Sequence, residues 1–396
     1  MHAEPEPGFS LPVGYRAFHP DQLFNFQLNR PFSLGYAREE DLAEVGRAVA
    51  DFADWKREML CQAERAASES RLVNAAAYFR AAEFYTLPDD PDKDVLYERF
   101  LTFFHRGFEG HGFRRIEVPW QGALLPGLDV AGAIPDGEGG TAPPGGTIVL
   151  HGGFDSFIEE FYSLMWYFSR RGFRVIGFDG PGQGGARRRS GLPLDFRWEG
   201  PVGAVLDHLD LDDVTLVGLS MGGYFALRAA AFEPRIARVI VSGHAYDYMR
   251  IAPAPAAWVL RFFHDRLRGF TNRVSRWKIR QGGMEAWSIS QLMYVLDVDE
   301  PMAALDFALD LNEGNLRSER VTQDVLVLAG AADHFIPLRL HAEQLRRLTA
   351  ARSVTGRVFT EEDRAENHCQ IGNLELALRV MSDWIESKSG RRSAPA

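Results

Sequence analysis

Apolar residues recur at helical spacing along the first hundred positions of the chain. From residue 39 to about residue 82, large apolar side chains return every three or four positions, a spacing that predicts helices with one buried face. An alanine-rich stretch at 70–84 continues this pattern, prolines at 88 and 91 interrupt it, and residues 94–105 resume it. We therefore predict that residues 1–110 form an N-terminal helical block that contributes to a cap.

From residue 111 onward the pattern changes to short apolar runs of strand length. Residues 113–120 and 128–134 alternate as the two strands of a hairpin do. Continuous apolar runs follow at 147–151, 174–179, 213–217, 237–242 and 324–329, and a last strand and helix are predicted at 353–359 and 373–386. Helical patterns lie between them, for example at 157–170, 195–209 and 338–348. This alternation predicts an α/β fold with a mostly parallel central sheet flanked by helices.

The alternation stops between residues 244 and 320. This segment is helical in tendency and rich in large side chains that need a surface to cover: Trp258, Phe262, Phe263, Trp277, Trp287, Met293, Tyr294 and Phe307. Since the top of the sheet is the nearest such surface, we predict a helical cap insertion between two parts of the core, residues 111–243 and 321–388. An independent helical lobe with no role at the site is the alternative, and residues 389–396 are predicted to be a flexible tail.

The charge of the chain argues against nucleic acid as its partner. Its 44 Lys and Arg residues are outnumbered by 54 Asp and Glu residues, which gives a net charge of −10, and no basic stripe is available to neutralise phosphates. The one notable basic run, the three arginines at 187–189, is interpreted as part of a solvated loop. A small molecule is the expected partner.

The two cysteines and the first residues indicate the compartment. Cys61 and Cys369 cannot make a disulfide framework, and they have no histidines at metal-ligand spacing. The first residues lack a basic region followed by an apolar core, and no window is apolar enough to span a bilayer. We expect a cytoplasmic protein without a membrane partner, a metal or a cofactor.

One short turn, residues 218–222, carries the strongest chemical signal. Its Gly-Leu-Ser-Met-Gly sequence lies between a β-branched apolar run and a run of small, helix-forming residues. A serine on such a tight strand-to-helix corner projects its hydroxyl from the top of a sheet, and the glycines leave room for the close backbone packing. Ser220 is therefore the predicted nucleophile.

A serine hydroxyl needs a base and a third group that orients the base. Asp333 follows the apolar run at 324–329, and His368 lies between the last predicted strand and the last predicted helix. The chain order Ser, Asp, His, with each residue on a loop leaving the same edge of the sheet, is the order that this arrangement requires. We predict a Ser220–His368–Asp333 triad.

Two further features concern the loop after the run at 147–151. The backbone N–H of Met221, at a helix start, and that of Phe154 or Gly153 in this loop are the predicted oxyanion-hole donors. Asp155 follows the loop directly. Its carboxylate could face the pocket beside Ser220 and move a proton at a substrate ketone or phenol, or it could merely cap the next helix.

Together these motifs resemble the α/β-hydrolase superfamily. They are His-Gly-Gly-Phe-Asp-Ser at 151–156, Phe-Asp-Gly-Pro-Gly-Gln-Gly at 178–184, the serine turn, Ala-Asp-His-Phe-Ile-Pro at 332–337 and Asn-His-Cys-Gln-Ile-Gly-Asn at 367–373. The chain is similar to the branch that contains 2,6-dihydroxypseudooxynicotine hydrolase, the fungal polyketide-shortening hydrolases and the FrsA-like esterases. The resemblance implies the same triad, no cofactor and a homodimer. It also implies that Asp155 stands where the nicotine-degrading member has an acidic residue that assists carbon–carbon bond cleavage, but here the residue is Asp rather than Glu, which shortens its reach.

Three functional hypotheses follow from these residues. The first is a serine hydrolase that cleaves a carbon–carbon bond beside a carbonyl in an aromatic or polyketide-like ketone. The second is a carboxylesterase, lactonase or thioesterase with the same triad, or an acyltransferase or cyclase if a dry cap excludes water. The third is a ligand-binding protein on a hydrolase fold that has lost its activity.

Overall fold

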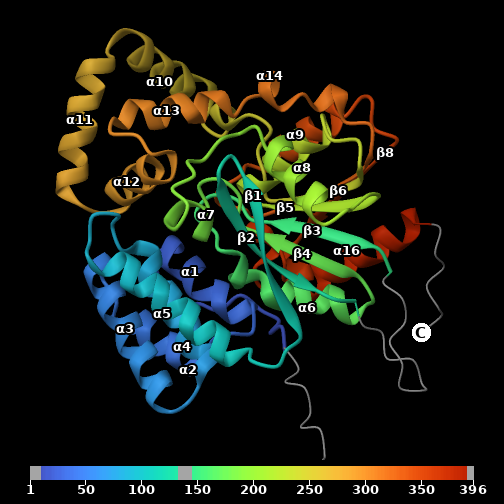
Figure 1. Cartoon of the computed structure of the whole chain (residues 1–396). Helices are drawn as coiled ribbons and strands as arrows, with labels where there is room; N and C mark the ends of the chain where they lie inside the picture. Colours follow the sequence, from blue (N-terminus) through green and yellow to red (C-terminus); the bar gives the residue numbers. More distant parts are fainter. Residues whose placement is uncertain (1–9, 133–144, 390–396) are drawn as a thin grey trace, which may run out of the picture.

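A sheet of eight strands forms the centre of the molecule (Figure 1). The computed structural model describes residues 10–132 and 145–389, so residues 390–396 of the predicted tail lie outside the described residues. The strands are β1 (Phe113–Trp120), β2 (Ala123–Val130), β3 (Thr147–His151), β4 (Arg174–Phe178), β5 (Val214–Leu219), β6 (Ile236–Ser242), β7 (Asp324–Gly330) and β8 (Ser353–Phe359).

Strand order and direction agree with the predicted α/β fold. The strands lie in the order β1, β2, β4, β3, β5, β6, β7, β8. β2 runs antiparallel to both of its neighbours, and every other neighbouring pair is parallel. All six residues of β5 are buried, as expected for a central strand that helices cover on both faces. The carboxyl ends of β3, β5 and β7 therefore meet at one edge of the sheet.

Helices cover both faces of the sheet. α6 (Tyr162–Arg170) and α16 (Leu374–Lys388) pack together on one face, and α8 (Glu199–His208) and α9 (Met221–Ala230) pack together on the other. α15 (Arg339–Arg347) joins the second group through the buried Leu340. The short α7 (Gly184–Arg188) and five 3₁₀ turns complete the core: η1 (Ile158–Phe161), η2 (Tyr248–Arg250), η3 (Ser318–Arg320), η4 (Glu361–Asp363) and η5 (His368–Gln370).

The N-terminal block consists of five helices that lie beside one end of the sheet (Figure 1). They are α1 (Gln22–Ser33), α2 (Glu39–Ala48), α3 (Phe52–Ser68), α4 (Leu72–Tyr85) and α5 (Asp92–Gly107). The helical pattern at 39–82 is thus divided at residues 49–51, where Asp51 caps α3. α1, which contains a proline, was not predicted. Asp21 caps it by accepting hydrogen bonds from the backbone N–H groups of Leu23 and Phe24.

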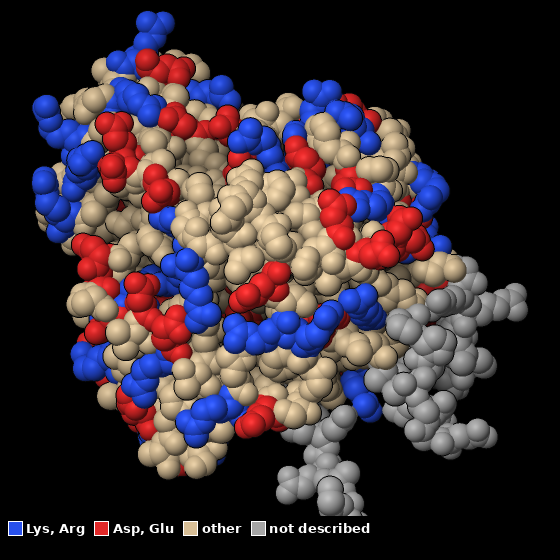
Figure 2. All heavy atoms as spheres, in the orientation of Figure 1, with Lys and Arg blue, Asp and Glu red and all other residues tan. Residues whose placement is uncertain are grey.

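The segment between β6 and β7 is helical, as predicted, but its helices are buried to different degrees. It contains α10 (Ala254–Arg266), α11 (Arg268–Gln281), α12 (Met284–Leu296), α13 (Pro301–Asp310) and α14 (Glu313–Leu316). α12 and α13 bury Trp287 and Phe307, among others, whereas α10 and α11 bury no residue. Figure 2 shows Lys and Arg side chains gathered at the edge that α11 occupies in Figure 1.

Within residues 10–132 and 145–389, no helix combines the length and the apolar content needed to cross a bilayer.

Candidate active site

Ser220 lies at a strained corner between β5 and α9. Its φ of +58° is in a region that residues with a side chain rarely adopt. The corner is also too tight for larger neighbours. A Cβ added to Gly218 would lie 2.1 Å from the carbonyl oxygen of Gly222, and one added to Gly222 would lie 2.4 Å from the carbonyl oxygen of Gly152. The sequence therefore folds here into the sharp turn that presents a hydroxyl at the sheet edge.

The structure brings Ser220, His368 and Asp333 together in one chain of hydrogen bonds. Nε2 of His368 lies 2.9 Å from Oγ of Ser220, and Nδ1 of His368 lies 2.7 Å from Oδ2 of Asp333. The imidazole and the carboxylate are both buried, with 7% and 3% of their side chains exposed. The arrangement leaves Nε2 free to take the hydroxyl proton while Nδ1–H is held by the carboxylate.

Local contacts shift the pKa values of Asp333 and His368 in opposite directions. The backbone N–H groups of Phe335 and Ile336 each donate to Oδ1 of Asp333 at 2.9 Å. Burial opposes ionisation of Asp333, but His368 and these N–H groups outweigh it and hold its pKa below the ordinary value. For His368, burial disfavours the charged ring, whereas Cys369 and Asp333 favour it and raise the pKa above 6.5. An imidazolium that formed here would be stabilised.

The loop after β3 meets the N-terminus of α9, as the predicted oxyanion donors require. A Cβ on Gly153 would lie 2.6 Å from the backbone nitrogen of Met221, so the loop and the helix are in direct contact there. Phe154 comes next, and its ring centroid lies 6.5 Å from that of Trp287 in α12. Gly153 and Met221 thus lie against each other at the corner that carries Ser220, and Phe154 follows Gly153 in the chain.

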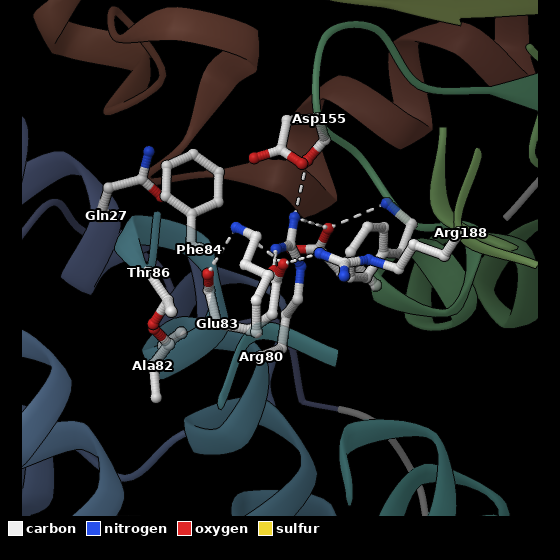
Figure 3. Close-up of polar contacts among 12 residues, drawn as sticks. Gln27, Arg80, Ala82, Glu83, Phe84, Thr86, Asp155 and Arg188 are labelled. Atoms are coloured by element: carbon white, nitrogen blue, oxygen red, sulfur yellow. Dashed lines mark hydrogen bonds and ion pairs between the residues drawn. The ribbon is translucent and has the colours of Figure 1, made fainter. Parts of the chain in front are cut away.

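Asp155 is buried and has a strained backbone, with a φ of +52° and 4% exposure. Its backbone carbonyl accepts a hydrogen bond of 2.6 Å from Arg80 in α4 (Figure 3). Its carboxylate atom Oδ2 has no hydrogen-bond partner among the described residues. Burial raises the pKa of Asp155 to about 6, although Arg80 opposes the shift. A carboxyl with this pKa can exchange a proton near neutral pH.

A buried cluster of charged side chains joins Asp155 to the N-terminal block (Figure 3). Glu83 is completely buried and forms ion pairs with Arg80, Lys93 and Arg188. Although burial opposes its charge, these three cations lower the pKa of Glu83 to about 2. The interpretation of the arginine run as a solvated loop is wrong for Arg188, whose side chain is 4% exposed. Its partner lies 105 residues earlier, beyond the reach of local sequence patterns.

Aromatic side chains from three parts of the chain surround the site. The ring of Phe26, from α1, lies 5.9 Å from that of His368 and 4.9 Å from that of His334. Phe335 approaches His368 to 4.9 Å. On the side of the loop after β3, Trp287 stacks on Phe84 with ring centroids 5.0 Å apart. Phe26 was not predicted as a site residue, and no local sequence signal marks it.

A comparison with protein families identifies the fold. Residues 147–368, more than half of the chain, match the model of the alpha/beta hydrolase family. The chain belongs to the alpha/beta hydrolase family. This confirms the fold expected from the sequence, and the family together with the names of its relatives shows that the protein is a hydrolase.

Curated relatives of this α/β hydrolase are fungal hydrolases. Hydrolase acrC of Aspergillus aculeatus is 30% identical over 336 residues, which cover 72% of this chain and 77% of the relative. Hydrolase LUC6 of Fusarium sp is 29% identical over 426 residues, which cover 94% of this chain and 98% of the relative.

Two solved structures share the fold of this hydrolase, including its N-terminal helices. The crystal structure of 2,6-dihydroxy-pseudo-oxynicotine hydrolase superposes with a TM-score of 0.63 and 21% identity, over 93% of this chain and 98% of the other. AbyA5 superposes with a TM-score of 0.67 and 18% identity, over 89% and 91%. The expected resemblance to this branch of the superfamily is confirmed.

Proposed function

We propose that this protein is a serine hydrolase that cleaves a carbon–carbon bond next to a ketone in a small aromatic or polyketide-like substrate. The observation that carries the proposal is the hydrogen-bonded chain from Ser220 through His368 to Asp333, with separations of 2.9 and 2.7 Å. The order of these residues along the sequence and their loops at one edge of the sheet support the same roles.

The reaction begins with attack of the Ser220 oxygen on the substrate carbonyl. His368 takes the hydroxyl proton, and the N–H groups of Met221 and of Phe154 or Gly153 stabilise the oxyanion. Collapse of the tetrahedral intermediate breaks the bond between the carbonyl carbon and its neighbour, and the electron pair leaves with the neighbouring carbon. The leaving carbon receives the proton that His368 took from Ser220, either directly or through the carboxyl of Asp155, and His368 is then neutral again. Water, activated by His368, then releases the acyl group from Ser220.

Asp155 is the residue that separates carbon–carbon cleavage from ester hydrolysis. An ester leaving group departs as an alkoxide or phenoxide that His368 can protonate alone, whereas a carbanion-like leaving group benefits from a second acid. The buried position of Asp155 and its pKa of about 6 support this role. So does the resemblance to the 2,6-dihydroxypseudooxynicotine hydrolase branch. The aromatic rings around His368 and Phe154 favour a substrate with an aromatic or conjugated ring.

The test compares Asp155→Asn with the wild type on an aryl β-diketone and on a p-nitrophenyl ester. We expect kcat on the diketone to fall by about 10²-fold, within the range attributed to general acid–base catalysis, and kcat on the ester to fall much less. Asp94→Asn is the matched control, because Asp94 pairs with Arg188 of the same cluster but is 84% exposed. An equal, small loss on both substrates would reject the acid role and favour the esterase alternative.

A further inference from the structure

Gln183 is a buried side chain that the reaction scheme leaves unused. It precedes α7 and is 2% exposed. Its amide nitrogen Nε2 donates to two consecutive backbone carbonyls of the loop after β3, those of Gly152 at 2.8 Å and Gly153 at 2.7 Å. Its amide oxygen accepts from the N–H of Gly180 at 3.0 Å. Only one orientation of the amide group, with Nε2 toward the two carbonyls and the oxygen toward Gly180, satisfies all three contacts.

The two carbonyls that Gln183 holds belong to the peptide units of the candidate oxyanion donors. The carbonyl of Gly152 shares a peptide plane with the N–H of Gly153, and the carbonyl of Gly153 shares one with the N–H of Phe154. Both peptide bonds are trans, and in a trans peptide the C=O and N–H bonds point in opposite directions. With both carbonyls directed toward Gln183, both N–H groups are directed away from it.

Other side chains complete the fixation of this loop. Nδ1 of His151 lies 3.0 Å from the carbonyl oxygen of Gly152, and Oγ of Ser156 donates to that of Gly153 at 3.1 Å. The turn that carries Gln183 is also fixed. The carboxylate of Asp179, at the start of this turn, accepts hydrogen bonds from the backbone N–H groups of Ile158 in η1 and Gly185 in α7. The loop therefore has little freedom to rotate its peptide planes.

We propose that Gln183 is a positioning residue that orients the oxyanion loop, so that the N–H groups of Gly153 and Phe154 face the substrate oxygen before it becomes charged. The inference rests on the proposed function, because it presumes attack by Ser220. Donors that the folded protein already holds in the right orientation stabilise the oxyanion more, because no reorganisation is needed during the reaction. Gln183 touches no substrate and acts only through the backbone that it holds.

The test replaces Gln183 with methionine, which has a similar length and no amide donor. With p-nitrophenyl butyrate as the probe, we expect Gln183→Met to lower kcat at least about 10-fold, toward the 10²–10³-fold loss seen when an oxyanion donor is removed, with KM changed by less than about 3-fold. The second readout is the inhibition constant of phenyl trifluoromethyl ketone, whose serine adduct carries an oxyanion. It should weaken by the same factor as kcat/KM, since both report transition-state stabilisation.

Gln323→Met is the matched control. Gln323 is also buried, and its amide also donates to one backbone carbonyl, that of Ala230, at 2.9 Å, at the opposite end of α9 from Ser220. It should keep kcat and the inhibition constant at wild-type values. If Gln183→Met fails to fold, Ser156→Ala, which removes one donor to the carbonyl of Gly153, should still lower kcat and weaken the inhibitor in parallel.

Two outcomes would overturn the inference. One is a folded Gln183→Met variant with wild-type kcat and inhibitor affinity. The other is a loss confined to KM or to thermal stability, which would indicate a purely structural role. Ser220→Ala separates this failure from failure of the proposed function. If Ser220→Ala abolishes activity while Gln183→Met retains it, the positioning role alone is wrong, whereas an active Ser220→Ala variant would refute the serine mechanism itself.

Discussion

The molecule has two groups of helices outside the α/β core, the N-terminal block and the insertion between β6 and β7. They differ in how closely they pack against the candidate site. From the N-terminal helices, the ring of Phe26 packs against His368, and Arg80 donates a hydrogen bond to the backbone carbonyl of Asp155. The pair α10–α11, in the later insertion, buries none of its residues. Its exposed large apolar side chains include Trp258 at 66% and Trp277 at 53% exposure. From that insertion, Trp287 of α12 approaches Phe154 in the loop after β3, with ring centroids 6.5 Å apart.

The two regions differ in burial rather than in helical content. Both regions are helical and rich in aromatic residues in the sequence. In the N-terminal block these residues form part of the main core, together with a buried ion cluster centred on Glu83. We therefore expect substitutions at buried N-terminal residues to change stability, those that also contact the site to change turnover, and substitutions in α10–α11 to change neither.

The largest effect is expected from Glu83→Gln. The variant leaves Arg80, Lys93 and Arg188 without their shared buried carboxylate, and removing one partner of a buried ion pair costs about 3–5 kcal/mol. Denaturant unfolding should show this loss of unfolding free energy. Glu285→Gln in α12 is the control, because Glu285 pairs with Lys278 but is 68% exposed. It should change stability by less than about 0.5 kcal/mol, and similar losses in both variants would contradict the comparison.

Asp155→Asn is expected to stabilise the protein at pH 7.5. The native pKa of about 6 lies above the ordinary value of 3.8, so between these values the folded state binds a proton that the unfolded state has released. Stability therefore falls as pH rises through this range, and the full deficit, up to about 3 kcal/mol, is present above pH 6. Asparagine removes the deficit. The difference in unfolding free energy from the wild type should shrink toward pH 4, and a gain that did not depend on pH would refute this explanation.

Phe26→Leu should affect turnover more than folding. Leucine keeps most of the apolar volume, so a loss of less than about 1.5 kcal/mol is expected, but the ring contact with His368 is lost. A small displacement of the base should reduce kcat by about 10-fold. Phe52→Leu is the control in the same block, since Phe52 contacts Phe24 and Tyr85 but not the triad. Equal kcat values in the two variants would show that Phe26 of α1 has no effect on turnover.

The smallest effect is expected in α10–α11. Trp258→Gln and Trp277→Gln replace side chains that are more than half exposed, so the unfolding free energy should stay within about 0.5 kcal/mol of the wild type. Turnover should also be unchanged. A clear loss of kcat in either variant would show that this helix pair also affects the site. It would contradict the proposed difference between α10–α11 and the N-terminal block.

Much of the core could be predicted from local patterns in the sequence. β8 was predicted with the observed bounds, and the predicted helices at 195–209 and 338–348 contain α8 and α15. The positions of Ser220, Asp333 and His368 also followed from the sequence, because residues that leave parallel strands at their carboxyl ends gather at one edge of the sheet. Strand order alone was enough to predict that these three residues lie close together, without knowledge of side-chain packing.

The contacts between the N-terminal block and the site could not be predicted in this way. Arg188 stands between two other arginines, and its burial depends on distant partners such as Glu83 and the ring of Phe157. Similarly, Phe26 and His368 are more than 300 residues apart in the chain, and nothing near either residue indicates their contact. Such contacts depend on how separate helices pack, which periodicity does not specify.

Labelling with a fluorophosphonate tests the central claim most directly. A phosphonate that reacts with activated serines should form one covalent adduct per chain, and peptide mass spectrometry should place it on Ser220. Labelling should be absent in Ser220→Ala and slowed by at least about 10³-fold in His368→Ala, because the hydroxyl is inert without its base. An adduct on another residue, or an unlabelled Ser220 in protein that still turns over substrate, would contradict the account.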